Sequence, residues 1–377
     1  MRIAICTDQY LPLLSGVSDS IDTLKGELEK HGHTVRIYAP ATTGSVPDPD
    51  VKRLHQIPIP GSGEALVFVF PFGMLDDLRA FKPDIIHSHS TGIIGWRGAL
   101  AARKLGVPLV GTSHTLPVSY LHYFKSDHAL GKWLVRNYTA AYFGRCSIIS
   151  APSKAMIDEL NAYGLHADTR VISNPIRTDQ FYPLQEKPAL KKKWGVRERA
   201  VLLFGRIAKE KNIDDGLAVF AEITHTSDDV QLVVVGDGPY RALFERNARE
   251  RGLADRVKNM GLRRGDELNE ILNACDVFII TSESETQSMT TLQAMACGLP
   301  IVAARAGALP EYVHDGGNGY IREPHDTKGF ANRILQVLDN PALAHELGEE
   351  GRETALKFSP EKIVTRFEEM YKDALRK

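Results

Sequence analysis

The sequence predicts an α/β protein made of two doubly wound domains, each with a parallel sheet covered by helices. Short apolar runs rich in β-branched residues alternate with helical patterns along the chain, which is typical of βαβ units. This alternation starts again near residue 200, after a proline-punctuated segment without periodicity. The length of 377 residues also exceeds that of one ordinary single-core domain.

The apolar runs predict the strands one by one. In the first domain the expected strands are 3–6, 34–38, 85–87, 109–111 and 147–150. In the second domain they are 200–204, 231–235, 277–281 and 301–303. The segment 172–176, together with 181–183 after it, is the predicted hinge, and the predicted domains are 1–175 and 176–359. Because ligands of open α/β sheets bind beyond the carboxyl ends of strands, we expect the loops after these strands to line a cleft between the domains.

The composition excludes several classes of protein. A hydrophobic content of 43% is too high for a disordered chain. With 46 Lys and Arg against 47 Asp and Glu, no global field attracts nucleic acid, so we expect no nucleic-acid partner. The longest apolar run, 65–75, falls short of the ~20 residues that span a bilayer. The chain reaches Asp8 before any secretory apolar region, and its four scattered cysteines have no metal-ligand spacing, so we expect a cytoplasmic protein with buried thiols.

Two cations follow the first strand of the second domain. Arg206 and Lys211 lie on the loop and first helical turn after 200–204, where both could reach one anion. A forked guanidinium and a compact ammonium suit a diphosphate whose leaving charge must be stabilised. A solvated basic turn paired with Glu210 explains this segment equally well.

The loop after strand 277–281 leads into a helix closed by Gly298 and Pro300. Its first N–H groups and the positive end of the helix dipole predict a diphosphate seat. These groups belong to Ser288, Met289 and Thr290. Glu285 would then lie beside whatever the diphosphate carries, although a helix-capping carboxylate is the alternative.

Glycines after two other strands allow a close approach of backbone to phosphate. Gly236 follows strand 231–235, but Arg241 replaces the third glycine of a dinucleotide fingerprint, so a dehydrogenase loses its main support. Gly16 lies between the first strand and its helix, where backbone amides could meet the same phosphates from the opposite wall. A tight turn at Gly236 and simple loop flexibility at Gly16 are the alternatives.

His114 follows strand 109–111 and could donate to a sugar hydroxyl or transfer protons near neutral pH. A lone histidine is more often structural, and His87 and His89 compete for the same role. No Asp or Cys accompanies them at a familiar ligand spacing, and the carboxylate pair of 48–50 lies in a proline-broken loop. We therefore expect no metal site.

Aromatic and basic side chains alternate between residues 120 and 145, a pattern that suits a membrane interface with anionic head groups. The members are Tyr120, His122, Tyr123, Phe124, Lys125, Lys132, Trp133, Arg136, Tyr138, Tyr142, Phe143 and Arg145. The apolar stretch 68–75 adds a second surface that could face lipid. A core helix with a solvated face is the alternative for the first segment. The hypothesis is peripheral attachment to the inner face of a membrane.

Together these segments resemble the retaining, nucleotide-sugar-dependent glycosyltransferases with two Rossmann-like domains, the GT-B architecture, over nearly the whole chain. The residues that carry the resemblance are the Gly16 loop, His114, Gly205-Arg206 with Glu210-Lys211, Gly236-Asp237-Gly238-Pro239, Met260-Gly261, Glu285 to Gly298-Leu299-Pro300, and Gly307-Ala308-Leu309-Pro310-Glu311.

The resemblance implies roles for the domains and their residues. Domain 1–175 would bind the acceptor, with the last helix, 360–377, packing back on it, and domain 176–359 would bind the nucleotide sugar. Arg206 and Lys211 would hold the donor diphosphate. Gly261 and Leu262 would meet the base, while Glu285 would face the transferred sugar and His114 would hydrogen-bond it.

The family signature has two glutamates separated by seven residues, but here Gln293 occupies the second position after Glu285. That residue normally accepts hydrogen bonds from the ribose hydroxyls. Gln293 keeps one carbonyl acceptor and loses the negative charge, so we expect weaker donor binding or a changed donor choice.

The segment around His114 and the residues after Glu285 are most similar to the branch that glucosylates diacylglycerol or related lipids. The resemblance therefore implies transfer of a hexose from a UDP- or GDP-sugar to a lipid at an anionic membrane surface, without a metal or other cofactor. A nucleotide-sugar epimerase and a nucleotide-sugar-binding protein that has lost catalysis remain as alternatives.

Overall fold

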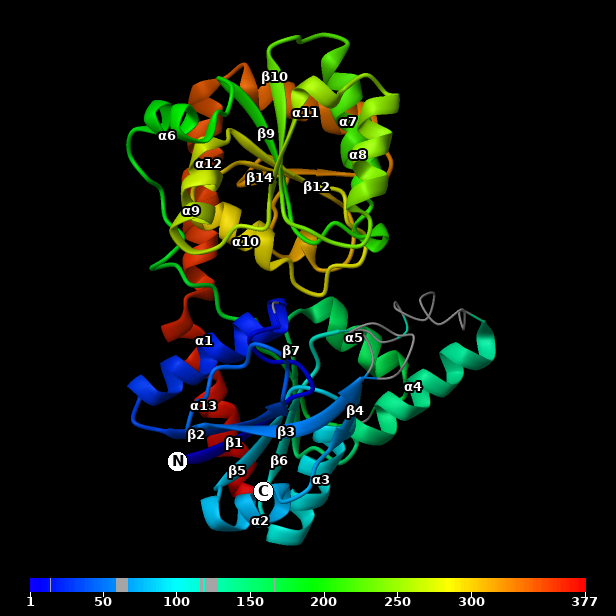
Figure 1. Ribbon diagram of the computed structural model, residues 1–377, viewed down its shortest axis with the longest axis vertical. Helices are drawn as coiled ribbons and strands as arrows, with labels where there is room; N and C mark the ends of the chain where they lie inside the picture. The colour runs from blue at the N-terminus through cyan, green and yellow to red at the C-terminus, as the bar shows by residue number, and fades with distance from the viewer. Residues whose placement is uncertain (14, 59–66, 116–117, 119–127, 166) are drawn as a thin grey trace. The chain divides into compact units, whose positions relative to one another are not determined.

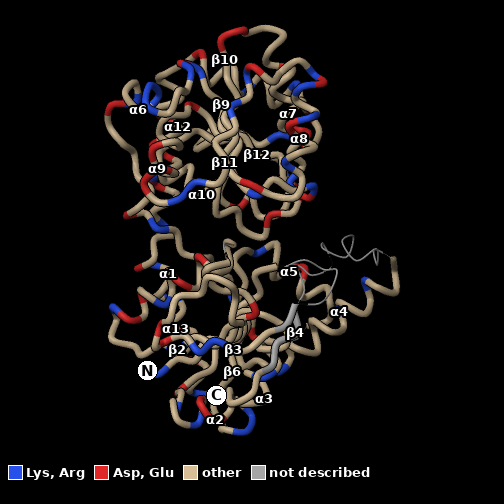
Figure 2. Tube along the Cα trace, in the orientation of Figure 1, with Lys and Arg blue, Asp and Glu red and all other residues tan. Residues whose placement is uncertain are grey.

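The computed structural model describes residues 1–13, 15–58, 67–115, 118, 128–165 and 167–377. The chain divides into two compact units. Unit 1 comprises Met1–Pro175 and Pro360–Lys377, and unit 2 comprises Ile176–Ser359. Each unit has one sheet with helices on both faces (Figure 1). Acidic and basic residues are interspersed along the chain of both units (Figure 2).

The sheet of unit 1 has the strand order β4-β3-β2-β1-β5-β6-β7-β8. Neighbouring strands are parallel except β4, which pairs antiparallel with β3. The strands are β1 (Arg2–Cys6), β2 (Thr34–Pro40), β3 (Val51–Pro58), β4 (Val67–Phe70), β5 (Ile85–Ser88), β6 (Leu109–Thr112), β7 (Ile148–Ala151) and β8 (Thr169–Val171). The central strands β1, β5, β6 and β7 are buried at every position except Arg2, as expected where helices cover both faces.

Two apolar clusters fill the faces of this sheet. One is formed with α2 (Met74–Phe81), α3 (Ile93–Leu105), α4 (Ala129–Phe143) and α5 (Lys154–Ala162). The other is formed with α1 (Gly16–Lys30) and α13 (Pro360–Arg376). The buried residues of α13 recur every three or four positions, which gives the helix one apolar stripe toward unit 1. The last helix of the chain is therefore part of the core of unit 1.

The sheet of unit 2 has the order β11-β10-β9-β12-β13-β14 and is parallel throughout. Its strands are β9 (Arg199–Phe204), β10 (Val230–Val235), β11 (Val257–Gly261), β12 (Val277–Ile280), β13 (Ile301–Ala304) and β14 (Gly319–Arg322). The α-helices are α6 (Lys187–Trp194), α7 (Ile213–Thr224), α8 (Arg241–Glu250), α9 (Gly265–Ala274), α10 (Met289–Ala296), α11 (Thr327–Leu338) and α12 (Pro341–Ala355). Short 3-10 helices are η2 (Lys209–Lys211), η3 (Ala254–Arg256), η4 (Leu309–Glu311) and η5 (Leu356–Phe358).

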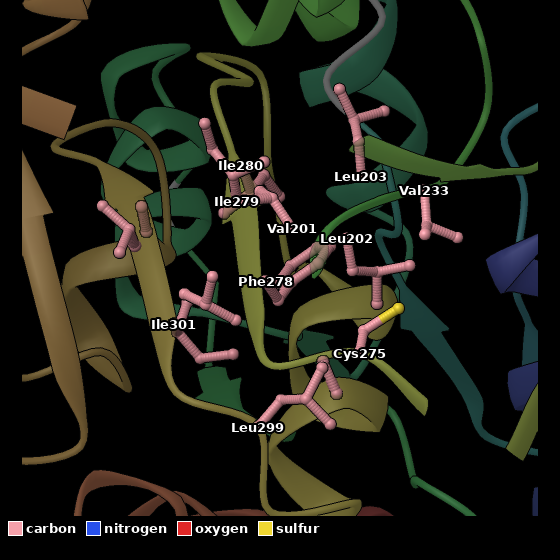
Figure 3. Close-up of a cluster of buried hydrophobic side chains, with 14 of the residues drawn as sticks. Val201, Leu202, Leu203, Val233, Cys275, Phe278, Ile279, Ile280, Leu299 and Ile301 are labelled. Carbon is pink, nitrogen blue, oxygen red and sulfur yellow. The ribbon is translucent and has the colours of Figure 1, made fainter. Parts of the chain in front are cut away.

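One continuous apolar core holds unit 2 together. Leu202 of β9, Phe278 of β12 and Ile301 of β13 are completely buried in it, and their side chains lie close together in Figure 3. Cys275 also lies in this core, and the four cysteines of the chain are all buried and unbridged. Burial raises the pKa of the Cys275 thiol to about 12, so it stays protonated.

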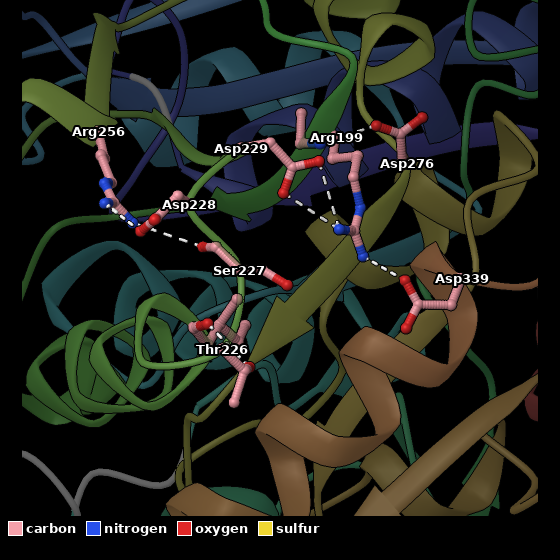
Figure 4. Close-up of polar contacts among 10 residues, drawn as sticks. Arg199, Thr226, Ser227, Asp228, Asp229, Arg256, Asp276 and Asp339 are labelled. Carbon is pink, nitrogen blue, oxygen red and sulfur yellow. Dashed lines mark hydrogen bonds and ion pairs between the residues drawn. The ribbon is translucent and has the colours of Figure 1, made fainter.

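Ion pairs gather near the amino ends of the unit 2 strands (Figure 4). Arg199, the first residue of β9, binds Asp229 at 3.1 Å and also Asp339 after α11. Arg256 binds Asp228 at 2.7 Å just before β10. These side chains pair with one another and lie at the opposite end of the sheet from the loops predicted to bind ligand.

The structure confirms the predicted fold class, and nine of its strands, β1, β2, β5, β6, β7, β9, β10, β12 and β13, overlap the nine predicted runs. Five strands were missed: β3, β4, β8, β11 and β14. All five lie toward the ends of the two sheets. β3, for example, contains Lys52, Arg53, His55 and Gln56, so it has no continuous apolar run.

Candidate functional site

The loops at the carboxyl edge of the unit 2 sheet are packed backbone to backbone. The N–H of Gly236 donates to the carbonyl of Gly261 at 2.9 Å, and the N–H of Gly205 donates to that of Val235 at 3.0 Å. A Cβ on Gly236 would lie 1.9 Å from the carbonyl oxygen of Gly205. Gly236 has φ +133° and Gly205 +148°, which side chains rarely adopt. Any side chain at position 236 would collide with the backbone of Gly205, so this position requires glycine.

Lys211 and Glu285 meet at this edge. Lys211 ends η2 after β9, and its Nζ lies 2.7 Å from Oε1 of Glu285 in the loop after β12. The Glu285 side chain is 9% exposed, and its backbone carbonyl accepts from the N–H of Ala308 at 2.9 Å. Gly307 permits this contact, since a Cβ there would lie 2.3 Å from the same carbonyl oxygen. Loops after β9, β12 and β13 therefore hold one buried carboxylate beside one ammonium.

Arg206 is in a different environment from Lys211. Its side chain is 55% exposed, and it forms an ion pair with Glu210 at 3.4 Å. The guanidinium is open to solvent, whereas the side chain of its partner Glu210 is only 8% exposed. The two predicted cations share one loop, and each has a carboxylate partner.

The N-terminus of α10 is capped by Ser288. Its Oγ accepts from the N–H of Thr291 at 3.3 Å and lies 3.1 Å from Oγ1 of Thr290. The N–H of Ser288 donates to the Tyr312 hydroxyl at 2.9 Å, so the prediction that this amide is open to a phosphate is wrong. Burial raises the pKa of Tyr312 well above its ordinary value, so the hydroxyl stays protonated. Within the described ranges, the N–H groups of Met289 and Thr290 have no hydrogen-bond acceptor.

The residues predicted to meet the nucleoside lie on neighbouring elements of unit 2. Gln293 is 9% exposed on α10, one helical turn beyond Met289. Gly261 ends β11 in the left-handed region with φ +66°, and Leu262 after it is 54% exposed. An exposed leucine beside an open glycine gives a flat apolar contact of the kind that a base can use.

In unit 1, Gly16 is the first residue of α1 rather than a loop residue. Ser15 precedes it as N-cap, and its Oγ accepts from the N–H of Ser18 at 3.1 Å. Leu14, part of the predicted phosphate loop, lies outside the described residues. Gly16 thus offers its amide at a helix N-terminus, where an anion would be favoured.

His114 lies in a buried polar network at the carboxyl ends of β5 and β6. Its Nε2 is 2.8 Å from Nδ1 of His89, and Nε2 of His89 is 3.2 Å from Nδ1 of His87. Burial lowers the pKa of His87 to about 3 and that of His114 to about 4, where a hydrogen bond with Asn174 opposes the shift. Burial and the neighbouring imidazoles also lower the pKa of His89. All three rings are neutral near pH 7.

Sequence reasoning singled out His87 and His89 only as competitors of His114, and it missed Tyr312 altogether. The spacing His87-Ser88-His89 is visible in the sequence, but the contact with His114 depends on β5 pairing with β6. In the described part of the chain, no group of three His, Cys, Asp or Glu side chains is arranged to hold a metal ion.

The predicted lipid-facing segment falls partly on α4. Three apolar side chains of this helix are largely exposed: Leu130, Trp133 and Leu134 are 61%, 58% and 53% exposed. By contrast, Tyr142 and Phe143 are buried in the core, as the alternative interpretation expected. Residues 120 and 122–125 lie outside the described residues, as do the side chains of 68–70. Of the helices that the structure describes, none has the length and apolar character needed to cross a membrane.

Two family models match this chain. Residues 186–354 match glycosyl transferases group 1, and residues 14–180 match Glycosyltransferase Family 4. An alpha-monoglucosyldiacylglycerol synthase of Streptococcus pneumoniae is 32% identical over 100% of this chain and 86% of its own length. The chain belongs to the group 1 glycosyltransferases and is a glycosyltransferase.

Other similar proteins carry different names. An alpha-monoglucosyldiacylglycerol synthase of Acholeplasma laidlawii is 28% identical over 100% of this chain and 98% of its own. A GDP-mannose-dependent alpha-mannosyltransferase of Mycobacterium tuberculosis is 31% identical over 81% of this chain and 80% of its own. The crystal structure of Anabaena HepE with UDP-glucose matches the fold with TM-score 0.80 at 20% identity, covering 99% of this chain and 100% of that one.

Proposed function

We propose that this glycosyltransferase moves glucose from UDP-glucose to a hydroxyl of a membrane lipid such as diacylglycerol, with retention at the anomeric carbon and without a metal ion. The observation that carries the proposal is the contact of Lys211 Nζ with Glu285 Oε1 at 2.7 Å, at the carboxyl edge of the unit 2 sheet. The cation there would bind the diphosphate of the donor, and the carboxylate would bind its sugar.

The donor diphosphate would bind to the cations of the β9 loop and to the start of α10. Lys211 and Arg206 would supply charge, and the N–H groups of Met289 and Thr290 would supply main-chain donors. As the bond from the anomeric carbon to the phosphate oxygen breaks, negative charge grows on the leaving diphosphate. Donors already in place stabilise that charge without reorganisation, which is how such a site would accelerate the reaction.

Glu285 would orient the transferred sugar. Its carboxylate already pairs with Lys211, so it is poorly suited to the covalent nucleophile that retaining hydrolases use. We favour attack from the same face as the leaving group. The acceptor oxygen bonds to the anomeric carbon, and the acceptor proton passes to the departing phosphate oxygen. In unit 1, His114 would hydrogen-bond the sugar.

The lipid acceptor is supported by α4 and by the relatives named as alpha-monoglucosyldiacylglycerol synthases. Leu130, Trp133 and Leu134 form one exposed apolar side at i, i+3 and i+4 spacing. The helix also carries Lys132 and Arg136 and no carboxylate, and its blue segments are visible in Figure 2. An apolar side with cations suits peripheral binding to an anionic leaflet, which we propose is the inner face of the membrane.

The proposal is tested with purified protein, a panel of UDP- and GDP-sugars, and vesicles with and without diacylglycerol and anionic lipid. We expect release of UDP from UDP-glucose only when diacylglycerol is present, together with an α-linked glucolipid, and no effect of EDTA. A β-linked product would contradict retention. Altered sugar without acceptor would indicate an epimerase, and binding without turnover would indicate a binding protein.

A further inference from the structure

Two residues at the carboxyl edge of the unit 2 sheet have a backbone conformation that glycine usually supplies. Among the described residues, four that are not glycine have positive φ: Lys82, Glu186, Asn212 and His325. Asn212 follows Lys211 and has φ +46°, and His325 lies in the loop after β14 and has φ +66°. Such residues are uncommon, and they cluster at functional sites. The side chains of Asn212 and His325 are therefore candidates for a role at this edge.

Both side chains contact Glu283, a carboxylate that the proposed mechanism does not use. Nδ2 of Asn212 donates to Oε1 of Glu283, and Nε2 of His325 lies 3.4 Å from the same oxygen. Nδ1 of His325 lies 2.7 Å from Oδ2 of Asp215 in α7. With a hydrogen on each nitrogen, the imidazolium form of His325 can pair with both carboxylates. One oxygen of Glu283 is therefore contacted from the loop after β9 and from the loop after β14.

The loop after β12 is also joined to the turn after β9 on both sides of Glu283. Oγ1 of Thr281 donates to the carbonyl of Asn212 at 2.8 Å, and Oγ of Ser284 donates to the carbonyl of Glu210 at 3.0 Å. Both acceptors are main-chain carbonyls, so these two bonds do not need the side chain of Asn212. The contribution of that side chain can therefore be measured separately from the contribution of its backbone.

The contacts of Glu283 are too exposed to be important for stability. Its side chain is 42% exposed and that of His325 is 67% exposed, and exposed ion pairs contribute little free energy to folding. Orientation is more sensitive, because a misplacement of about 1 Å at an active site can lower the rate by about 10²-fold. Glu283 lies two residues before Glu285, whose Oε1 is 2.7 Å from Nζ of Lys211. Contacts that hold Glu283 thus hold the short segment that presents Glu285.

We propose that Asn212 and His325 are positioning residues that act through Glu283. By holding this carboxylate, they keep Glu285 beside the turn that carries Lys211. This inference rests on the roles proposed for Lys211 and Glu285 in transfer. It explains why two left-handed positions at this edge carry side chains instead of glycine. It also makes the loop after β14, the last strand at one end of the sheet, a support of the site.

The test is a set of double-mutant cycles on the full chain, with kcat and KM for UDP-glucose and a thermal melt for each variant. Asn212→Gly and His325→Gly remove the side chains, while glycine keeps the left-handed backbone without strain. We expect each to lower kcat by about threefold to tenfold, the range that one hydrogen bond supplies, with KM changed by less than about twofold. Added to Glu283→Ala, neither should lower kcat further, because both act through that carboxylate.

Glu186→Gly is the matched control, because Glu186 has φ +63° in unit 2 and its side chain makes no capping bond to α6. It should leave kcat unchanged. An unchanged kcat in Asn212→Gly and His325→Gly, an equal loss in the control, or losses that add fully to that of Glu283→Ala overturn the inference. Lys211→Ala, measured beside them, distinguishes the two failures. If it retains transfer, the proposed function of the site is wrong, and if it alone loses transfer, only the inference is wrong.

Discussion

The two sheets have similar frameworks, but the side chains at their carboxyl edges differ in charge. In unit 2, loops after β9 and β12 bring together Lys211 and Glu285, two formal charges 2.7 Å apart. In unit 1, loops after β5 and β6 bring together His89 and His114, whose pKa values burial lowers, so both are neutral. One edge can bind an anion, and the other can exchange hydrogen bonds with hydroxyl groups.

The difference shows that a parallel sheet sets where a site lies and its loops set the chemistry. A buried neutral imidazole has no charge to offer a diphosphate, whereas the ammonium of Lys211 does. We therefore expect variants in unit 2 to act on the donor and its leaving group, and changes in unit 1 to act through neutral hydrogen bonds.

The largest effect should come from Lys211→Ala. Loss of the ammonium removes one fixed charge from the departing diphosphate, and we expect kcat to fall by about 10²–10³-fold with any donor. Lys209→Ala is the matched control, since Lys209 lies on the same short helix η2 and its side chain is exposed. Initial rates with UDP-glucose and a thermal melt of each variant check the prediction. Near-normal transfer by Lys211→Ala would contradict the diphosphate assignment.

Acid should destabilise unit 1 before unit 2. Folding lowers the pKa of His114 from 6.5 to about 4, so the unfolded chain binds more protons between these values and stability falls as the pH falls. At pH 5 the loss is on the order of 2 kcal/mol for each such histidine. Burial raises the pKa of Asp8, which opposes part of this loss.

Tryptophan fluorescence can follow each unit separately during urea unfolding. Trp194→Phe leaves Trp96 and Trp133, which report on unit 1, and the double variant of those two leaves Trp194, which reports on unit 2. When the pH is lowered from 7 to 5, the urea concentration at the unfolding midpoint should decrease for unit 1. It should change less for unit 2, because the four histidines of unit 2 are exposed. Equal decreases of the midpoint in both units would contradict the expected difference between the buried histidines of unit 1 and the exposed histidines of unit 2.

How much the sequence could predict depended on position in the sheet. β10 is buried at all six positions, and its apolar run was predicted because both faces and both edges are covered. β11 lies at the end of the same sheet with only one neighbour, and it contains Lys258 and Asn259, so no run marks it. Solvent at a sheet edge permits polar residues, and the signal of the strand then disappears.

The candidate site was predictable where its residues directly follow a strand. Lys211 and Glu285 were both singled out in this way, although their contact depends on two loops 74 residues apart. Tyr312 and Tyr371 were not predicted, because each reaches its partner through tertiary packing. The Tyr371 hydroxyl lies 2.8 Å from Nδ1 of His87, which is 284 residues away, and no local pattern joins them.

A smaller effect is expected at the exposed apolar side of α4. Trp133→Ala removes a side chain that is 58% exposed, and we expect binding to vesicles with anionic lipid to weaken by roughly tenfold, since burying such a side chain contributes about 1.5–3 kcal/mol. Transfer to a short-chain, water-soluble diacylglycerol should stay unchanged. Tyr182→Phe, an exposed aromatic of unit 2, is the control. Undiminished vesicle binding by Trp133→Ala would contradict membrane attachment through α4.

The smallest effect is expected when one more charged side chain is added at the carboxyl edge of unit 2. Gln293→Glu introduces the carboxylate that the family signature has at this position of α10, where Gln293 is 9% exposed. Hydrogen bonds from hydroxyls to a charged acceptor are roughly twice as strong as to a neutral one, so we expect KM for UDP-glucose to fall by about threefold with kcat nearly unchanged. Gln336→Glu on α11 adds the same charge elsewhere and should leave KM unchanged. An unaltered or higher KM in Gln293→Glu, with the fold intact, would mean that Gln293 does not meet the ribose and that the donor lies elsewhere along this edge.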